Sequence, residues 1–110
     1  MSNFITDEDV EKALDYLRDS AAATAKAKAE RIYVEEYRKS LKAILMKEHP
    51  EESGIVQERE AYADERYLAH LNAIRIAVEE EEKLKYLREG ARAKIEAFQT
   101  LSANYRSMKL

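Results

Sequence analysis

Apolar residues recur every three or four positions along most of the chain, and nowhere do they alternate with polar residues over the length of a strand. Only two glycines and one proline occur in 110 residues, so residues that break helices are scarce. Ala, Leu, Glu, Lys and Arg, which all favour helices, dominate the composition. The pattern therefore predicts an all-α protein built from few, long helices.

The first helix is predicted over residues 7 to 19. Thr6 is a suitable N-cap, and the acidic residues that follow it complement the helix dipole. Val10, Leu14 and Leu17 form an apolar stripe at helical spacing. A helix this short needs a packing partner to be stable.

The second helix is predicted over residues 21 to 48, after Asp19 and Ser20, which are possible caps. It must end before Pro50, because proline disfavours the helical conformation of the residue that precedes it. Its seam is expected to contain the large apolar residues spaced by three and four. These are Val34, Tyr37, Leu41 and Ile44, flanked by Tyr33 and Leu45.

The third helix is predicted over residues 56 to 108, because nothing after the turn at "HPEESGIVQE" forces an end. Asp64 could cap a restart within "AYADERY", which is an alternative to one continuous helix. Two apolar stripes follow. Leu71, Ile74 and Val78 form the first, and Leu84, Leu87, Ala91, Phe98, Leu101, Tyr105 and Met108 form the second, with Lys94 as its one poor member.

The second stripe begins one residue earlier than a continuation of the first would place it. This phase slip lies across residues 79 to 82, and it predicts that the helix changes its packing partner there. If the chain folds back near residues 49 to 55, paired positions add up to about 104. The slip then lies opposite the junction of the first two helices, where the partner should change.

Charge is arranged in four blocks. Residues 1 to 20 carry two basic and six acidic groups, and residues 21 to 47 carry seven basic and three acidic groups. Residues 48 to 82 carry three basic and eleven acidic groups, and residues 83 to 110 carry seven basic and two acidic groups. The net charges are −4, +4, −8 and +5, which together give the chain's −3. Folding back sets blocks of opposite sign side by side, and exposed pairs of this kind select orientation more than they stabilise.

These patterns together predict one domain over residues 1 to 110. It consists of a short N-terminal helix and a long antiparallel, coiled-coil-like helical hairpin that oligomerises. The acidic first helix is expected to neutralise the basic residues of the later stretch. Its acidic residues are Asp7, Glu8, Glu11 and Asp15, and the basic residues are Lys83, Lys85, Arg88 and Arg92.

No catalytic or metal-binding motif is present. At most two of the four glutamates from 79 to 82 can share one helix face, and no histidine completes a site with them. His70 is interpreted as a partly buried structural residue, and His49 as a helix-end residue. We therefore expect no enzyme activity, no metal and no cofactor.

The sequence also bears on the compartment. Without cysteine there can be no disulfide, and the acidic start lacks the pattern of a secretory signal. No run approaches the roughly 18 apolar residues that a membrane span needs. A cytoplasmic protein without a membrane partner is expected.

Two surfaces near the C-terminus are candidate sites. Phe98, Leu101, Tyr105 and Met108 form an apolar stripe that, if the first helix does not cover it, suits self-association or partner binding. Arg88, Arg92, Tyr105 and Arg106 combine cations with an aromatic ring, as surfaces that bind single-stranded nucleic acid do. The acidic net charge argues against a dedicated nucleic-acid binder.

The segments "RIYVEEYRKSLKAIL" and "QEREAYADERYLAHLNAIRIAVEEEEKLKYLREGARAKIEAFQTLSANYRSMKL" resemble small uncharacterised helical proteins of tailed phages and prophages. The resemblance spans about residues 28 to 110 and includes no catalytic motif. It implies an accessory role in the host cytoplasm, through binding a protein of DNA replication, recombination or host defence. The leading hypothesis is therefore a non-enzymatic, self-associating binding protein, and the alternative is a single-stranded nucleic-acid accessory protein.

Overall fold

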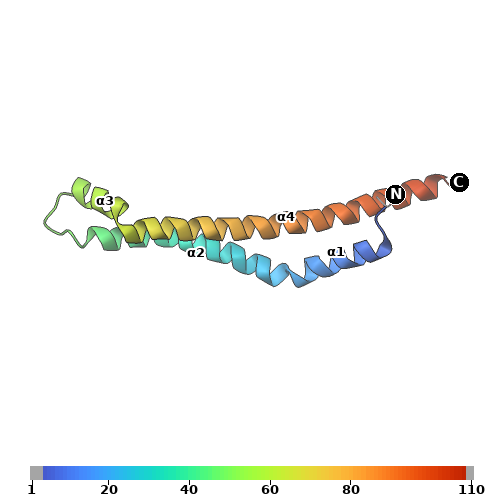
Figure 1. The fold of residues 1–110 in the computed structure, drawn as a ribbon, viewed down its shortest axis with the longest axis horizontal. Helices are drawn as coiled ribbons and strands as arrows, with labels where there is room; N and C mark the ends of the chain where they lie inside the picture. Colours follow the sequence, from blue (N-terminus) through green and yellow to red (C-terminus); the bar gives the residue numbers. More distant parts are fainter. Residues whose placement is uncertain (1–3, 109–110) are drawn as a thin grey trace. The chain divides into compact units, whose positions relative to one another are not determined.

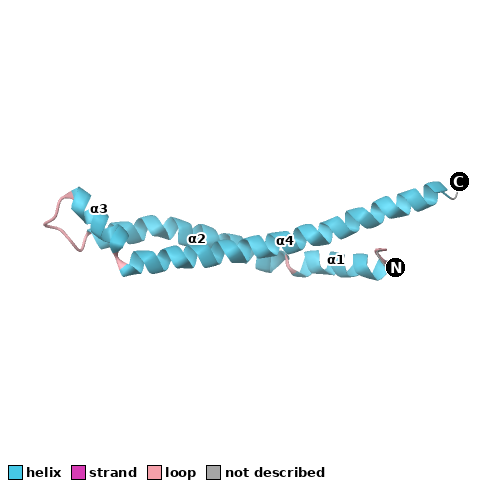
Figure 2. Ribbon diagram, turned by 45° about the horizontal axis from the view of Figure 1, so that its top comes forward, coloured by secondary structure: helices cyan, strands magenta, loops and turns pink. Residues whose placement is uncertain are grey.

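The computed structural model describes residues 4 to 108, which form four helices and no strand (Figures 1 and 2). The helices are α1 (Asp7–Asp19), α2 (Ala21–Met46), α3 (Gly54–Ala63) and α4 (Glu65–Met108). The all-α prediction is confirmed. The first helix has its predicted bounds, whereas the second ends two residues early.

The N-terminus of α1 is held by a reciprocal cap. The Thr6 hydroxyl accepts from the backbone N–H of Asp9 at 3.1 Å, and the Thr6 backbone N–H donates to the Asp9 carboxylate at 3.0 Å. This hydrogen bond from Thr6 is the main reason that the pKa of Asp9 lies below its ordinary value. The predicted N-cap is therefore correct.

Residues 47 to 53 form the turn between α2 and α3, drawn in pink in Figure 2. Ser53 caps α3 by accepting from the backbone N–H of Val56 at 3.3 Å. The side-chain amide of Gln57 donates to the carbonyl of His49 at 2.7 Å, which ties the two sides of the turn together. The turn lies where the proline predicted it.

The prediction of one helix over residues 56 to 108 is wrong, because the chain breaks at Asp64. Asp64 has extended backbone angles, and its carboxylate accepts from the backbone N–H of Arg66 at 2.8 Å, so it begins a new helix. The Arg66 guanidinium bonds the Asp64 carboxylate and also forms a bidentate pair with Glu48 at 2.7 and 2.9 Å. The break is thus joined to the end of α2.

The Asp64 carboxylate should stabilise the fold at neutral pH and lose this effect in acid. Hydrogen bonds from Arg66 lower its pKa from 3.8 to about 2, so the folded state binds its proton less readily than the unfolded state. With Asp64→Asn, the difference in Tm from wild type should be constant above about pH 5 and shrink as the pH falls toward about 2. Thermal unfolding followed by circular dichroism would measure it, and an equal difference at both ends of this range would contradict the assignment.

The chain divides into two compact units, and α4 belongs to both. Unit 1 contains the residues up to Thr24 and those from Glu82 onward, and unit 2 contains Ala25 to Glu81. α1 packs beside the later part of α4 in unit 1, and α2 packs antiparallel to the earlier part in unit 2. The predicted change of partner near residues 79 to 82 is confirmed, and the prediction of one domain stays a prediction.

The predicted phase slip is wrong, since one seam continues along α4. Its buried or half-buried positions recur alternately every three and four residues without a break. They are Tyr67, His70, Ile74, Ala77, Glu81, Leu84, Arg88, Ala91, Ile95, Phe98 and Ser102. The packing partner therefore changes while the seam stays in phase.

The core of unit 2 contains Leu45, Ala61 and Tyr67. Leu45 is 2% exposed, whereas the predicted seam residue Ile44 is 48% exposed and Tyr37 is also exposed. The seam of α2 thus lies one position away from the predicted one, although Val34 and Leu41 belong to both. α3 supplies the reason, because its Ala61 and the neighbouring Tyr67 pack on Leu45.

Charged pairs cross unit 2 as the block pattern predicts. Arg31 of α2 forms an ion pair with Glu81 of α4, and Lys42 of α2 lies 3.5 Å from Glu58 of α3. The Arg31 guanidinium donates hydrogen bonds to the carboxylates of Glu81 and of Glu35. These hydrogen bonds, first of all those to Glu81, raise the pKa of Arg31 above its ordinary value. The basic block therefore does lie against the acidic one at these points.

Candidate interaction surface

The placement of α1 in unit 1 depends on small side chains and one arginine. Ala13 of α1 and Ala91 of α4 are both buried, so two methyl groups take the place of larger seam residues. Arg88 of α4 donates from one nitrogen to the Leu17 carbonyl and to the Ser20 hydroxyl, each at 2.7 Å. The Leu17 carbonyl lies in the last turn of α1, where carbonyl groups lack partners within the helix.

This geometry corrects two predictions about Arg88. It was expected to pair with carboxylates of the first helix, but its partners are a carbonyl and a hydroxyl. It was also a candidate contact for nucleic acid, but the side chain is half-buried and directed into its own fold. Arg88 therefore acts as a C-terminal cap of α1.

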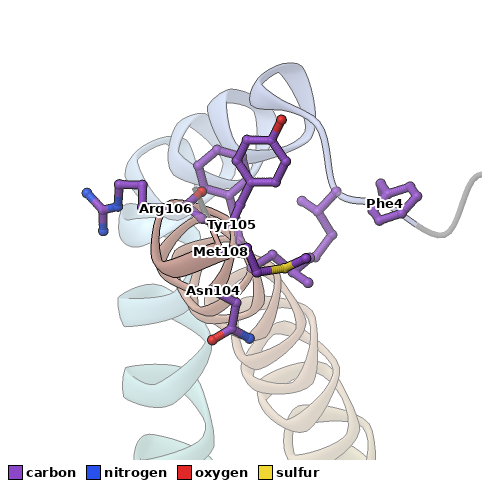
Figure 3. A pocket seen from close by; sticks show the side chains of 9 residues that line it. Phe4, Asn104, Tyr105, Arg106 and Met108 are labelled. Carbon is purple, nitrogen blue, oxygen red and sulfur yellow. The ribbon is translucent and has the colours of Figure 1, made fainter. Parts of the chain in front are cut away.

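The remaining candidates for nucleic-acid contact do not form a single cluster with Arg88. Arg92 and Arg106 are exposed, and neither has an ion pair with another described residue. Tyr105 is exposed as well and lines the same hollow as Arg106. In Figure 3, Arg106 points to the opposite side from Met108 and Phe4.

The predicted apolar stripe does gather in one place. Phe98, Leu101, Tyr105 and Met108 line a hollow of about 530 Å³, which we call the C-terminal groove. Phe4 also lines it, with Ile5 beside it; in Figure 3 Phe4 lies toward the side to which Met108 points. Exposure rises along the stripe, from half-buried Phe98 to 41% at Leu101, 61% at Tyr105 and 84% at Met108.

Sequence reasoning missed Phe4 and Ile5. They precede the first predicted helix, so no periodicity marks them as part of an apolar surface. The signal that was available is the hydrophobic staple, in which an apolar residue just before the N-cap packs against the helix start. Ile5 occupies this position before Thr6, and its packing includes the C-terminal groove.

A second hollow, of about 340 Å³, lies between α1 and α4 at Gly90. We call it the Gly90 hollow. Its edges carry two cations, Lys12 of α1 and Lys94 of α4, and its lining contains no carboxylate. Tyr16 also lines it, and the Tyr16 hydroxyl is buried without a hydrogen-bond partner among the described residues.

Gly90 itself is unexplained by the packing of the chain. It lies in the interior of α4, where glycine costs about 0.5–1 kcal/mol relative to alanine. A Cβ added there would meet nothing within 4 Å. The fold would therefore accept a side chain at this position, and the hollow above it is open.

The aromatic cluster of unit 2 contains His70. The His70 Nε2–H donates to the carbonyl of Val34 at 2.6 Å, and Tyr37 lies against the ring at 5.4 Å between centroids. Positions 34 and 70 add up to 104, the predicted register. His70 is half-buried, as predicted.

The described residues contain no group of three or more His, Asp and Glu side chains arranged to hold a metal ion. In the same part of the chain, no helix combines the length and the apolar character that crossing a membrane requires.

No known protein family matches this sequence, and comparisons with curated proteins and with solved structures find no significant similarity.

Proposed function

We propose that this chain is a non-enzymatic accessory protein that acts by binding other macromolecules and associates with itself through its C-terminal helix. The single observation that carries the proposal is the exposed apolar side of α4 at the C-terminal groove. Leu101, Tyr105 and Met108 are exposed there on a regular helix. Exposed apolar stripes of this kind mark interaction sites in soluble proteins.

The distribution of apolar side chains supports association more generally. Sixteen large apolar side chains are exposed among the described residues, while five of the eight buried apolar residues are alanines. Exposed apolar side chains in such numbers are typical of proteins that bind a partner.

The position of the groove favours the C-terminal helix as the associating element. α1 begins at Asp7, and Phe4 and Ile5 already line the groove beside Phe98 and Leu101. No helix of unit 1 precedes these residues among those described, so α1 leaves the last turns of α4 open. A further helix would cover them.

The class of macromolecular partner follows from the sequence resemblance. The pattern of residues 28 to 110, in which we noted a resemblance to small helical phage proteins, supports within this proposal a protein of DNA replication, recombination or host defence. Helical surfaces rich in tyrosine and arginine suit protein binding well, because these residues are enriched at interfaces. The partner of this proposal is therefore a protein.

Light scattering at micromolar concentrations tests the proposal, with Leu101→Asp as the variant and Gln99→Asp as the matched control. The wild type should form a dimer or a larger assembly, and Leu101→Asp should weaken it at least about tenfold, because a charge would be buried in the interface. Gln99 is exposed on the same helix but does not line the groove, so its variant should associate normally. A monomeric wild type, or an unchanged Leu101→Asp, would show that self-association is wrong.

The same experiment with an oligonucleotide, in low and high salt, tests the alternative function. Of the predicted nucleic-acid contacts, the exposed Arg92 and Arg106 are the cations that could bind phosphates. Binding through phosphates would raise the mass in low salt and disappear in high salt. If the solution mass is the same with and without the oligonucleotide, protein binding stays as the proposed function.

A further inference from the structure

A hollow of about 560 Å³ lies along α3 in unit 2, and we call it the α3 hollow. Its lining residues are Ile55, Glu58, Arg59, Tyr62 and Ala63. Ala61 of the same helix is buried in the core of unit 2, whereas Ile55 is 82% exposed and Tyr62 is exposed as well. α3 therefore packs one side on its own fold and presents apolar side chains on the other.

The Tyr62 ring is held in place by two neighbours. It packs edge-on against the ring of Tyr67 at 5.2 Å between centroids, and the Lys42 ammonium lies 4.7 Å from its centroid. Ordering a side chain on association costs conformational entropy, and a ring that is already ordered avoids most of this cost. The α3 hollow is thus prepared for a partner.

The surroundings of the α3 hollow are acidic. Residues 47 to 65 carry two basic and seven acidic groups, which is a net charge of −5. The fold pairs three of these carboxylates with cations, namely Glu48, Glu58 and Asp64. The other four have no ion pair with another described residue, and they are Glu51, Glu52, Glu60 and Glu65. Lys47 and Arg59 are unpaired in the same sense, so the unpaired carboxylates outnumber the unpaired cations two to one.

The C-terminal groove has the opposite charge and a matching spacing. Residues 83 to 108 carry six basic and two acidic groups, a net charge of +4, and the groove is lined by Arg106 but by no carboxylate (Figure 3). Leu101 and Met108 are seven residues apart on one helix, as are Ile55 and Tyr62 on another. Each pair therefore spans about 10.5 Å along its helix axis.

We propose that α3 of a second copy lies in the C-terminal groove, with Ile55 and Tyr62 packed on Leu101 and Met108. The proposal rests on the self-association proposed above and names the surface that the C-terminal helix binds. The contact joins two different surfaces, so each copy offers both a groove and an α3. Two grooves facing each other would instead bring two positively charged stretches together, which like-charge repulsion opposes.

Complementation between two variants tests this contact. Leu101→Asp sets a carboxylate against the acidic surroundings of α3, and Ile55→Lys sets an ammonium against the basic groove. Ile55 is exposed and lysine favours helices, so Ile55→Lys should keep the wild-type circular dichroism. Each variant alone should associate at least about tenfold more weakly than wild type. Mixed in equal amounts they should form a dimer in light scattering, because one chain keeps its groove and the other keeps its α3.

Gly54→Lys is the matched control for Ile55→Lys. Gly54 is exposed, does not line the α3 hollow, and has no atom within 4 Å of an added Cβ, so this variant should associate as wild type does. If the wild type associates but Ile55→Lys does so equally tightly, or the mixture stays monomeric, the contact is wrong and self-association stands. A wild type that is monomeric throughout would instead remove the proposed self-association.

Discussion

Leu45→Ala is expected to lower the free energy of unfolding by about 2–5 kcal/mol. Leu45 is the one large side chain in the described residues that is fully buried, and α2, α3 and α4 all contribute to its surroundings through Leu41, Ala61 and Tyr67. Removing it leaves a cavity that small neighbours such as Ala61 cannot fill. Urea unfolding of unit 2, followed by far-ultraviolet circular dichroism, measures the loss.

The matched control is the adjacent residue. Ile44→Ala removes a similar amount of hydrocarbon from the same turn of α2, but Ile44 is 48% exposed. Its effect should stay within about 0.5 kcal/mol. Equal losses for the two variants would mean that the seam of α2 runs through Ile44, as the sequence alone suggested, and would contradict the packing described here.

Arg88→Leu is expected to release α1 while leaving unit 2 intact. The substitution keeps an aliphatic chain in the seam but removes two hydrogen bonds from a charged group, to the Leu17 carbonyl and the Ser20 hydroxyl. A hydrogen bond to a charged group contributes about 1.5–3 kcal/mol. Hydrogen exchange should therefore show α1 amides at least about tenfold less protected, because 1.4 kcal/mol corresponds to a factor of ten.

Arg92→Leu serves as the control for this experiment. Arg92 lies one turn further along α4 and is exposed, so the same change should leave α1 protection unaltered. If both variants lost protection equally, the charge of the helix rather than the bonds of Arg88 would hold α1. If neither did, the cap would contribute nothing measurable.

The parts of the fold that sequence predicts well are those with local causes. Thr6 and Asp9 are three residues apart and cap α1 by themselves. The turn beyond His49 follows from Pro50, whose effect on the preceding residue needs no distant partner. The change of packing partner near residues 79 to 82 was also predicted, because folding back at residues 49 to 55 sets this segment opposite the junction of the first two helices; the phase slip that first suggested it is not present.

The seam of α4 was misread because apolar residues alone were counted. His70, Glu81 and Arg88 occupy seam positions, and each is accommodated by a partner far away in sequence: Val34, Arg31 and Leu17. Polar side chains at such positions look like interruptions until their partners are known. The apparent phase slip arose because Leu71 and Val78, which flank the seam, were counted in place of His70 and Ala77.

The break at Asp64 is another case in which a local signal was insufficient. The sequence shows that Asp64 can cap a helix, but many aspartates lie inside helices without ending them. What distinguishes this one is Arg66, which bonds both Asp64 and the distant Glu48. Of the candidate site, the apolar stripe was predictable from its spacing, whereas Phe4 and the Gly90 hollow required the packing of α1.

The division into two units bears on the order in which the protein forms. Unit 2 is one continuous stretch, from Ala25 to Glu81, so its helices can meet as soon as that stretch exists. α1 is made earlier, but it cannot pack until the segment that begins at Glu82 has been made. Closing unit 2 first brings these two segments together and reduces the entropy cost of their encounter. During synthesis, α1 is therefore expected to dock after the helices of unit 2 have met, although it is made before them.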